Sequence, residues 1–145
     1  FRDLDVPRPE SGLQADLLLD PVSKILSRSV DWVTPQDTIS KALELMSRRR
    51  KGCLPVVEKG RLCGILTEVD LLLKVQAKEQ DLTKTPVSTV LTPNPETIEE
   101  NASISDALHK MSIGGYRHIP VVREGSLVGV LSGKDVLRYL AERLS

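Results

Sequence analysis

Cysteine, aromatic residues and an excess of either charge are all scarce in this sequence. The chain has two cysteines, one tryptophan, two tyrosines and one phenylalanine, with 20 basic and 20 acidic residues. A predicted hairpin places Val56, rather than Cys53, opposite Cys63, so we predict no disulfide. Balanced charge argues against a nucleic acid or an anionic membrane surface as the partner.

Long hydrophobic runs and metal-binding clusters are missing as well. The longest apolar runs, such as Leu71–Leu73, are too short to cross a bilayer, and the N-terminal residues lack a signal-peptide pattern, so we expect a cytoplasmic protein with no membrane insertion. The scattered cysteines and histidines (His109 and His118) fit no metal site. No nucleophile with its base and no catalytic carboxylate pair is recognisable, so we expect neither an enzyme nor a catalytic cofactor.

An internal repeat dominates what the chain does contain. Residues 21–75 align without a gap on residues 86–140, and 19 of the 55 aligned positions are identical. A unit of this length buries little core alone, so we expect two small repeats that pack on each other about a pseudo-two-fold axis. The expected boundaries are a lead-in with a short docked helix at 1–20, repeat 1 at 21–77, a linker at 78–85 and repeat 2 at 86–145. The chain begins with Phe1 rather than Met, and we expect it to be a piece of a longer protein.

The periodicity of apolar residues changes in the same order within both repeats. Short strand candidates at 32–34 and 97–98 precede helices whose apolar residues recur at helical spacing. A hairpin follows, with Gly60 or Gly125 at the second turn position, and a last helix begins near residue 68 or 133. We therefore predict a β-α-β-β-α unit, made twice, in a mixed α/β (α+β) protein.

The last helices offer more apolar residues than one core-facing stripe requires. The expected core residues are Val69, Leu72, Leu73, Val136, Leu137, Leu140 and Leu144. Leu71, Val75 and Tyr139 remain as surplus apolar surface, and from them we predict a homodimer through the helices.

The best candidate for a functional site is a motif present once in each repeat. Thr67 and Asp70 in repeat 1, and Ser132 and Asp135 in repeat 2, stand three positions apart where a buried strand enters a helix. A hydroxyl and the N–H groups of a helix N-terminus suit a phosphate, and a carboxylate suits the paired hydroxyls of a ribose. The same pair can equally form a helix-capping box without any ligand.

The whole pattern resembles a tandem pair of CBS (cystathionine-β-synthase-type) domains, which is called a Bateman module. The resemblance covers about residues 21–143 and rests on both motifs, on the proline-containing stretches Leu54–Val57 and Ile119–Val122, and on the order of the elements. It implies a regulatory domain that binds adenosyl ligands (AMP, ADP, ATP or S-adenosylmethionine) in clefts between the repeats and controls an attached or partner protein.

The resemblance also implies roles for individual residues. Those implied to bind ribose or phosphate are Thr67, Asp70, Arg117, His118, Ser132, Lys134 and Asp135. Those implied to border the adenine are Val30, Asp31, Trp32, Gly52, Cys53, Leu54, Pro55, Pro95, Glu96, Thr97, Tyr116, Ile119 and Pro120. Because repeat 1 has Gly52 and Cys53 where repeat 2 has Arg117 and His118, we expect phosphate at the second motif and a neutral or cationic adenosyl group at the first.

Two functions remain open on the sequence alone. One is the ligand-sensing regulatory module, and the other is a structural homodimerisation module that binds no nucleotide and uses its motifs only as helix caps. In the second case Arg117 would pair with a surface carboxylate, and His118 would be a half-buried packing residue.

Overall fold

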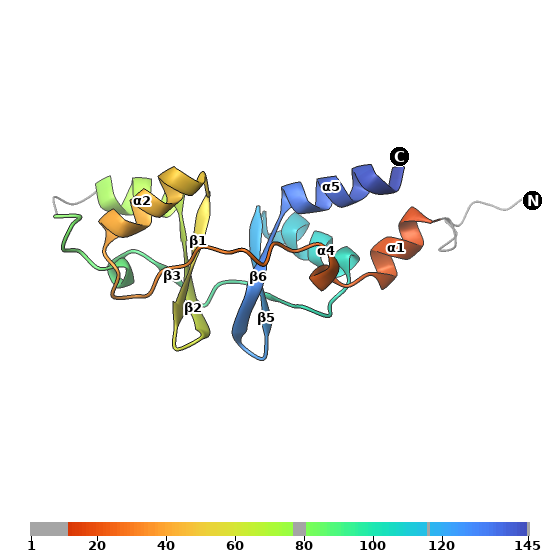
Figure 1. Cartoon of the computed structure of the whole chain (residues 1–145), viewed down its shortest axis with the longest axis horizontal. Coiled ribbons are helices and arrows are strands. Elements are labelled where there is room, and N and C mark those ends of the chain that lie inside the picture. Colours follow the sequence, from red (N-terminus) through yellow and green to blue (C-terminus); the bar gives the residue numbers. More distant parts are fainter. Residues whose placement is uncertain (1–11, 77–80, 116, 145) are drawn as a thin grey trace, which may run out of the picture. The chain divides into compact units, whose positions relative to one another are not determined.

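The computed structural model describes residues 12–76, 81–115 and 117–144, and it contains both helices and strands, as predicted (Figure 1). The helices are α1 (Leu13–Leu19), α2 (Ile39–Arg49), α3 (Glu68–Asp70), α4 (Ile104–Gly114) and α5 (Gly133–Leu144). The strands are β1 (Cys53–Glu58), β2 (Arg61–Thr67), β3 (Thr92–Pro93), β4 (Ile98–Glu99), β5 (His118–Arg123) and β6 (Ser126–Ser132). Single 3-10 turns at Val22–Lys24 and Val87–Thr89 begin the repeats, and Leu71–Val75 continues α3 as a π-helical segment. No helix among these described residues is long and apolar enough to cross a membrane.

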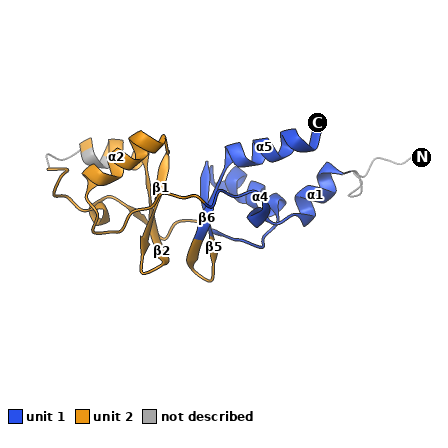
Figure 2. Cartoon of the chain, in the orientation of Figure 1, with its two compact units in different colours: residues 1–28, 97–121, 128–145 blue, residues 29–96, 122–127 orange. Residues whose placement is uncertain are grey.

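Two compact units divide the chain, and their boundaries cross those of the sequence repeats (Figure 2). Unit 1 comprises residues 1–28, 97–121 and 128–145, and unit 2 comprises residues 29–96 and 122–127. The first residues of each repeat therefore belong to the unit that the other repeat mainly forms, and we call them the exchanged segments. Residues 21–28 pack with repeat 2, and residues 86–96 pack with repeat 1.

Backbone hydrogen bonds seat both exchanged segments at equivalent places. In unit 1 the Val22 N–H donates to the Ala102 carbonyl over 2.8 Å, and in unit 2 the Val87 N–H donates to the Asp37 carbonyl over 2.7 Å. Farther along, β3 pairs antiparallel with β2 in unit 2. The lead-in helix α1 packs against α4 and α5 of unit 1, which confirms that a short helix docks at this end of the chain (Figure 1).

Each unit has its own apolar core, to which the exchanged segment contributes. The core of unit 1 is Val22, Leu26, Ile98, Ile104, Ala107, Ile119, Val121, Leu131, Val136 and Tyr139. The core of unit 2 is Val33, Ile39, Ala42, Met46, Leu54, Val56, Leu66, Leu71, Val87 and Val90. Burying one such aliphatic side chain stabilises the fold by about 1.5–3 kcal/mol, so the exchange is a substantial part of the stability of both units.

The prediction for the last helices was wrong in repeat 1 and partly confirmed in repeat 2. In repeat 1 the expected core residues Val69, Leu72 and Leu73 are more than half exposed, whereas Leu71, which we expected at a partner surface, is buried. The side chain of Val75 lies outside the described residues. In α5, Val136 is buried and Leu140 packs against the core, as predicted, but Leu137 and Leu144 are more than half exposed and Tyr139 is buried. In repeat 1 the capping bond between Thr67 and Asp70 fixes the start of the helix, and the next residue, Leu71, is the one that faces the core.

Both hairpins have the predicted two-residue turns, but the first has an irregular register. Gly60 and Gly125 have φ values of 80° and 85°, the left-handed conformation that glycine adopts without strain. A β-bulge places Gly64, rather than Cys63, opposite Val56, and Cys63 Sγ donates to the Val56 carbonyl over 3.3 Å. Both cysteines are free thiols, as predicted.

The first strand of each predicted repeat is shorter than the sequence suggested. Around residue 33 it is a single parallel bridge between Val33 and Val56, and in repeat 2 it is the two-residue strand β4.

The glycine that opens each motif is required by the exchanged segment. A Cβ atom on Gly64 would lie 2.7 Å from Leu91 Cδ1 and 2.9 Å from the Thr92 carbonyl oxygen. A Cβ atom on Gly129 would overlap the Leu26 side chain and the Ser27 carbonyl oxygen in the same way. Only glycine lets the exchanged chain pass this close to the strand.

We predict that Gly129→Ala destabilises the protein by about 1–3 kcal/mol, because the added methyl group must displace the backbone at Ser27. Gly133→Ala is the matched control, since a Cβ atom there meets nothing within 4 Å. It should leave stability unchanged or raise it slightly. Urea denaturation of the two variants measures the difference, and equal midpoints would contradict the role given to Gly129.

Candidate functional site

Both hydroxyl–carboxylate pairs cap the helix that follows them. The Asp70 N–H donates to Thr67 Oγ1 over 3.0 Å, and the Thr67 N–H donates to Asp70 Oδ2 over 3.3 Å. In repeat 2 the Ser132 N–H donates to Asp135 Oδ2 over 2.9 Å, and the Asp135 N–H donates to Ser132 Oγ over 3.3 Å. The capping interpretation is thus confirmed for both motifs. It accounts for about 1 kcal/mol of stability at each, and it holds each carboxylate in one orientation.

The two carboxylates have different further neighbours. Asp70 Oδ2 also accepts a hydrogen bond from Thr92 Oγ1 over 3.1 Å, and Thr92 lies in the exchanged segment. Asp135 is 7% exposed, its Oδ2 accepts from the Ser132 hydroxyl over 3.1 Å, and its Oδ1 lies 3.4 Å from Arg138 Nη2. A cation beside Asp135 offsets the cost of keeping a carboxylate out of water.

Sequence reasoning missed both Thr92 and Arg138. The spacing of Arg138, three residues after Asp135 on a helix, was a usable signal for a side-chain contact. Nothing in the sequence places Thr92 beside Asp70, because that contact depends on the exchange of segments between repeats.

A backbone hydrogen bond joins each motif to the loop before its hairpin. The Glu68 N–H donates to the Gly52 carbonyl over 3.1 Å, and the Gly133 N–H donates to the Arg117 carbonyl over 3.2 Å. These donors and acceptors occupy equivalent positions in the two repeats. In both units, therefore, the loop implied to border an adenine lies against the pair implied to bind a ribose.

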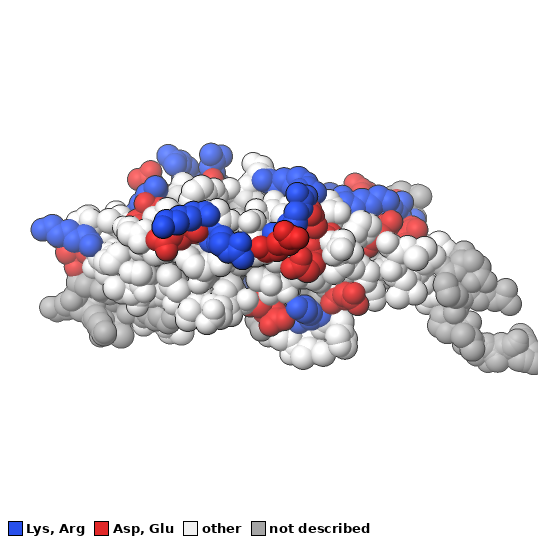
Figure 3. All heavy atoms as spheres, turned by 90° about the horizontal axis from the view of Figure 1, so that it is seen from below, with Lys and Arg blue, Asp and Glu red and all other residues white. Residues whose placement is uncertain are grey.

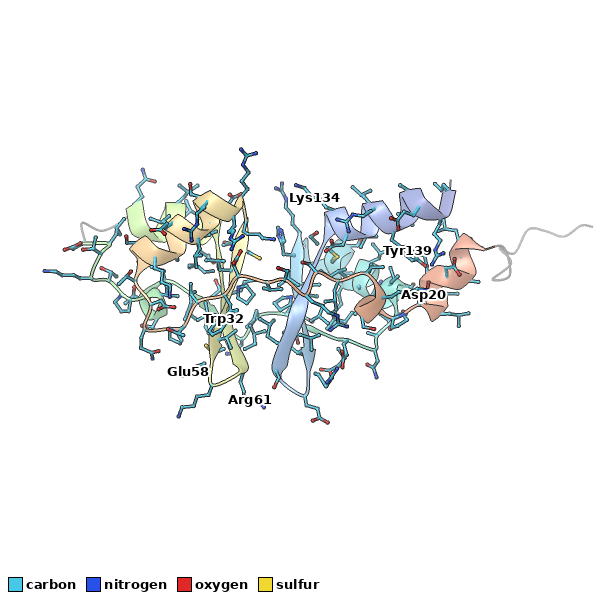
Figure 4. All side chains as sticks on the ribbon, in the orientation of Figure 1. Asp20, Trp32, Glu58, Arg61, Lys134 and Tyr139 are labelled. Carbon is cyan, nitrogen blue, oxygen red and sulfur yellow. The ribbon has the colours of Figure 1, made fainter. Side chains whose placement is uncertain are left out.

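In unit 2 a third implied segment reaches the same region. The Val33 N–H donates to the Pro55 carbonyl over 3.1 Å, which places residues 30–32 beside the start of β1. Trp32 is 49% exposed (Figure 4), and the Asp31 carboxylate lies 3.7 Å from Arg49 Nε at the end of α2. The indole of Trp32 therefore leaves an aromatic surface accessible in the segment that precedes Val33.

The residues of repeat 2 that are implied to border the adenine are divided between the two units. Pro95 and Glu96 belong to unit 2, whereas Thr97, Ile119 and Pro120 belong to unit 1. The structure thus groups Thr97 with the second motif and Pro95 and Glu96 with the first. Tyr116, which is also implied to border the adenine, lies outside the described residues.

Several implied adenine contacts are core residues. The side chains of Cys53, Leu54, Pro55, Ile119 and Pro120 are buried, so they offer a ligand backbone atoms rather than side-chain groups. Burial raises the pKa of the Cys53 thiol to about 11, so this cysteine is protonated at neutral pH.

The two motifs differ in the charges around them. Arg117 and Lys134 are exposed near the second motif. His118 is half-buried. The first motif has uncharged residues at the matching positions, and the exposed Glu68 replaces Gly133. On the face drawn in Figure 3, acidic and basic side chains are interleaved.

Comparison with known proteins identifies the family. The sequence model of the CBS domain matches residues 22–77 and 87–142. The CBS domain-containing protein YhcV of Bacillus subtilis is 34% identical over 118 residues, which is 81% of this chain and 84% of YhcV. The chain also matches the Arabidopsis thaliana protein CBSCBSPB5 with 39% identity, but it spans only 20% of that protein's length.

Solved structures give the same result. The structure of CBSX2 in complex with AMP superposes with a TM-score of 0.76 at 25% identity, over 86% of this chain and 98% of that one. The CBS domain pair of MJ0100, in complex with 5′-methylthioadenosine and S-adenosyl-L-methionine, gives 0.74 at 25% identity, over 86% and 98%. With a family match in each repeat and this agreement in fold, the chain belongs to the CBS domain family and carries two CBS domains in tandem.

Proposed function

We propose that this chain is a regulatory module that binds adenosyl ligands at its two hydroxyl–aspartate motifs and thereby controls an attached or partner protein. The observation that carries the proposal is the hydrogen bond from Glu68 to Gly52 and from Gly133 to Arg117, which joins the adenine-bordering loop to the ribose-binding pair in both units. The adenosyl ligands of CBSX2 and MJ0100 support the ligand class.

Each part of the motif contributes one interaction to the proposed complex. The carboxylate of Asp70 or Asp135 accepts hydrogen bonds from ribose hydroxyls, and the hydroxyl of Thr67 or Ser132 lies beside them. The N–H groups at the helix start favour a phosphate. The capping bonds already hold the carboxylate in position, so little side-chain entropy is lost on binding. The function is binding alone, with no reaction of the ligand.

The ligand controls the attached protein only if it binds one conformation of the module more tightly than another. We propose that the second motif takes the phosphorylated ligand, since Arg117 and Lys134 lie exposed beside it. The first motif, with Glu68 at its helix start, takes a neutral or cationic adenosyl group. With two sites that prefer different ligands, one module responds to the concentrations of both.

We predict that AMP raises the melting temperature of the protein and that Asp135→Ala weakens AMP binding by about ten- to a hundredfold, as expected for a hydrogen bond to a charged group. Ligand at a hundred times its dissociation constant adds about 2.7 kcal/mol of stability. Thermal shift and calorimetry with adenosine, AMP, ADP, ATP and S-adenosylmethionine measure both effects.

Asp106→Ala is the matched control for Asp135→Ala. Asp106 occupies the same position of a helix-capping pair, with its N–H bonded to Ser103 Oγ over 3.0 Å, but it lies at the start of α4, outside the motif. Asp106→Ala keeps this backbone bond and removes only the favourable interaction of the carboxylate with the N-terminus of α4, so it should cost about 0.3–1 kcal/mol of stability and keep AMP affinity. If no adenosyl compound shifts the melting temperature, the chain is instead a structural homodimerisation module whose motifs are caps only.

We predict that Arg117→Ala lowers affinity for AMP and ATP far more than affinity for adenosine. The lost affinity is electrostatic, so AMP binding to the native protein should also weaken as salt rises. Arg123→Ala, at the far end of β5, is the control for a general change of charge. Equal losses for adenosine and AMP in Arg117→Ala, measured at one salt concentration, would show that Arg117 does not hold phosphate.

We propose that the protein forms a homodimer through its last helices. The residues proposed for the dimer surface differ from those predicted from the sequence. Leu72 and Leu137 occupy equivalent positions of the two repeats and are 68% and 66% exposed. Exposed apolar side chains repeated in this way favour a partner surface. Sedimentation at tens of micromolar should show a dimer, and Leu72→Glu with Leu137→Glu should give a folded monomer. A monomeric native protein would exclude this assembly.

A further inference from the structure

Asp20, the residue directly after α1, is held by the last helix of the chain. Figure 4 labels Tyr139 on α5 and Asp20 beside α1. The Tyr139 hydroxyl donates to Asp20 Oδ2 over 2.6 Å, and Arg143 Nη2 lies 3.3 Å from the same oxygen. Arg143 Nε also lies 3.2 Å from Asp16 within α1, and its guanidinium carbon lies 4.8 Å from the centre of the Tyr139 ring. We call the group of Asp16, Asp20, Tyr139 and Arg143 the α1 clamp.

The central bond of the α1 clamp is short and charge-assisted. Hydrogen bonds of a hydroxyl to a carboxylate are about twice as strong as neutral ones, and Tyr139 is only 4% exposed. The hydrogen bond from Tyr139 lowers the pKa of Asp20, and burial together with this bond raises the pKa of Tyr139. At neutral pH the donor therefore keeps its proton and the acceptor keeps its charge.

One helix carries both the clamp and the second motif. Asp135 and Tyr139 are four residues apart in α5 and are buried together with Val136 on the same face. Residues so spaced move together when a helix tilts or shifts. Asp20 is also tied to α4, because its carbonyl accepts the Ile104 N–H over 3.0 Å. A shift of α5 at Asp135 therefore reaches Asp20, and through it the placement of α1.

The first repeat has different residues at the positions that match the central bond of the clamp. At the offset of 65 residues, Thr85 replaces Asp20 and Lys74 replaces Tyr139. The Thr85 hydroxyl donates to the nearby Asp81 carbonyl over 2.8 Å. Within the part of the chain that the structure describes, a clamp of this kind occurs beside the second motif.

We propose that the α1 clamp couples the second motif to α1. In this view Tyr139 is a positioning residue that holds α5, and with it Asp135, in the geometry that binds a nucleotide, and occupancy of the motif in turn restrains α1. The inference rests on the proposed function, since it needs AMP to bind at Asp135. Coupling between two sites is reciprocal, so weakening the clamp must change AMP affinity.

Tyr139→Phe tests the coupling, because it removes the hydroxyl and leaves the ring in the core. We expect AMP affinity to fall at least about fivefold, the lower end of typical coupling between sites. We also expect saturating AMP to slow hydrogen exchange of the α1 amides, Leu13–Leu19, in the native protein and not in Tyr139→Phe. Asp20→Asn keeps an acceptor for the tyrosine hydroxyl. Its AMP affinity should therefore lie between that of the native protein and that of Tyr139→Phe.

Thr38→Ala supplies a control of comparable stability loss. Thr38 caps α2 in unit 2, with Oγ1 accepting the Lys41 N–H over 3.2 Å, and its loss should leave AMP affinity and α1 exchange unchanged. Native AMP affinity in Tyr139→Phe, or α1 exchange that AMP does not alter in the native protein, overturns the coupling while the binding function stands. If the native protein binds no adenosyl compound, the proposed function fails and the coupling fails with it.

Discussion

The close passage of the exchanged segment over the motif glycine is the constraint on which the rest of this structure depends. At Gly64 and Gly129 the neighbouring chain lies where a side chain would begin. The same approach lets the segment deliver apolar residues to the core of the other repeat and, in unit 2, sets the Thr92 hydroxyl on Asp70. Folding and site construction therefore use a single contact, and glycine begins both motifs for a packing reason rather than for backbone freedom.

The sequence predicted the features that depend on residues only a few positions apart. The two-residue turns, the helix starts and the capping pairs follow from residue type and spacing over a few positions, and the internal repeat made the family recognisable. It could not predict the exchange of segments, because aligned repeats look the same whether or not the segments before their first strands are exchanged. It also chose the wrong face of the helix that begins at Glu68, since Leu71, Leu72 and Leu73 are equally apolar and their sequence does not show which of them turns inward.

Of the candidate site, the motifs and the loops that contact them were predictable, whereas the side chains around the carboxylates were less so. The bonds that cap each helix also hold the motif carboxylate in one orientation, and the proposed function uses that orientation. The charge difference between Arg117 with Lys134 on one side and Gly52 with Glu68 on the other is visible in sequence. The α1 clamp is not visible in sequence, since Asp20 and Tyr139, which make its central bond, are 119 positions apart.

A crystal structure of the chain grown with AMP tests the central claim most directly, namely that the motifs bind a nucleotide as well as cap their helices. The account predicts ribose hydroxyls within hydrogen-bonding distance of Asp135, the phosphate near Arg117, and the adenine against the backbone at Ile119. AMP bound elsewhere, or motif carboxylates that keep only their capping bonds in crystals saturated with AMP, would contradict it.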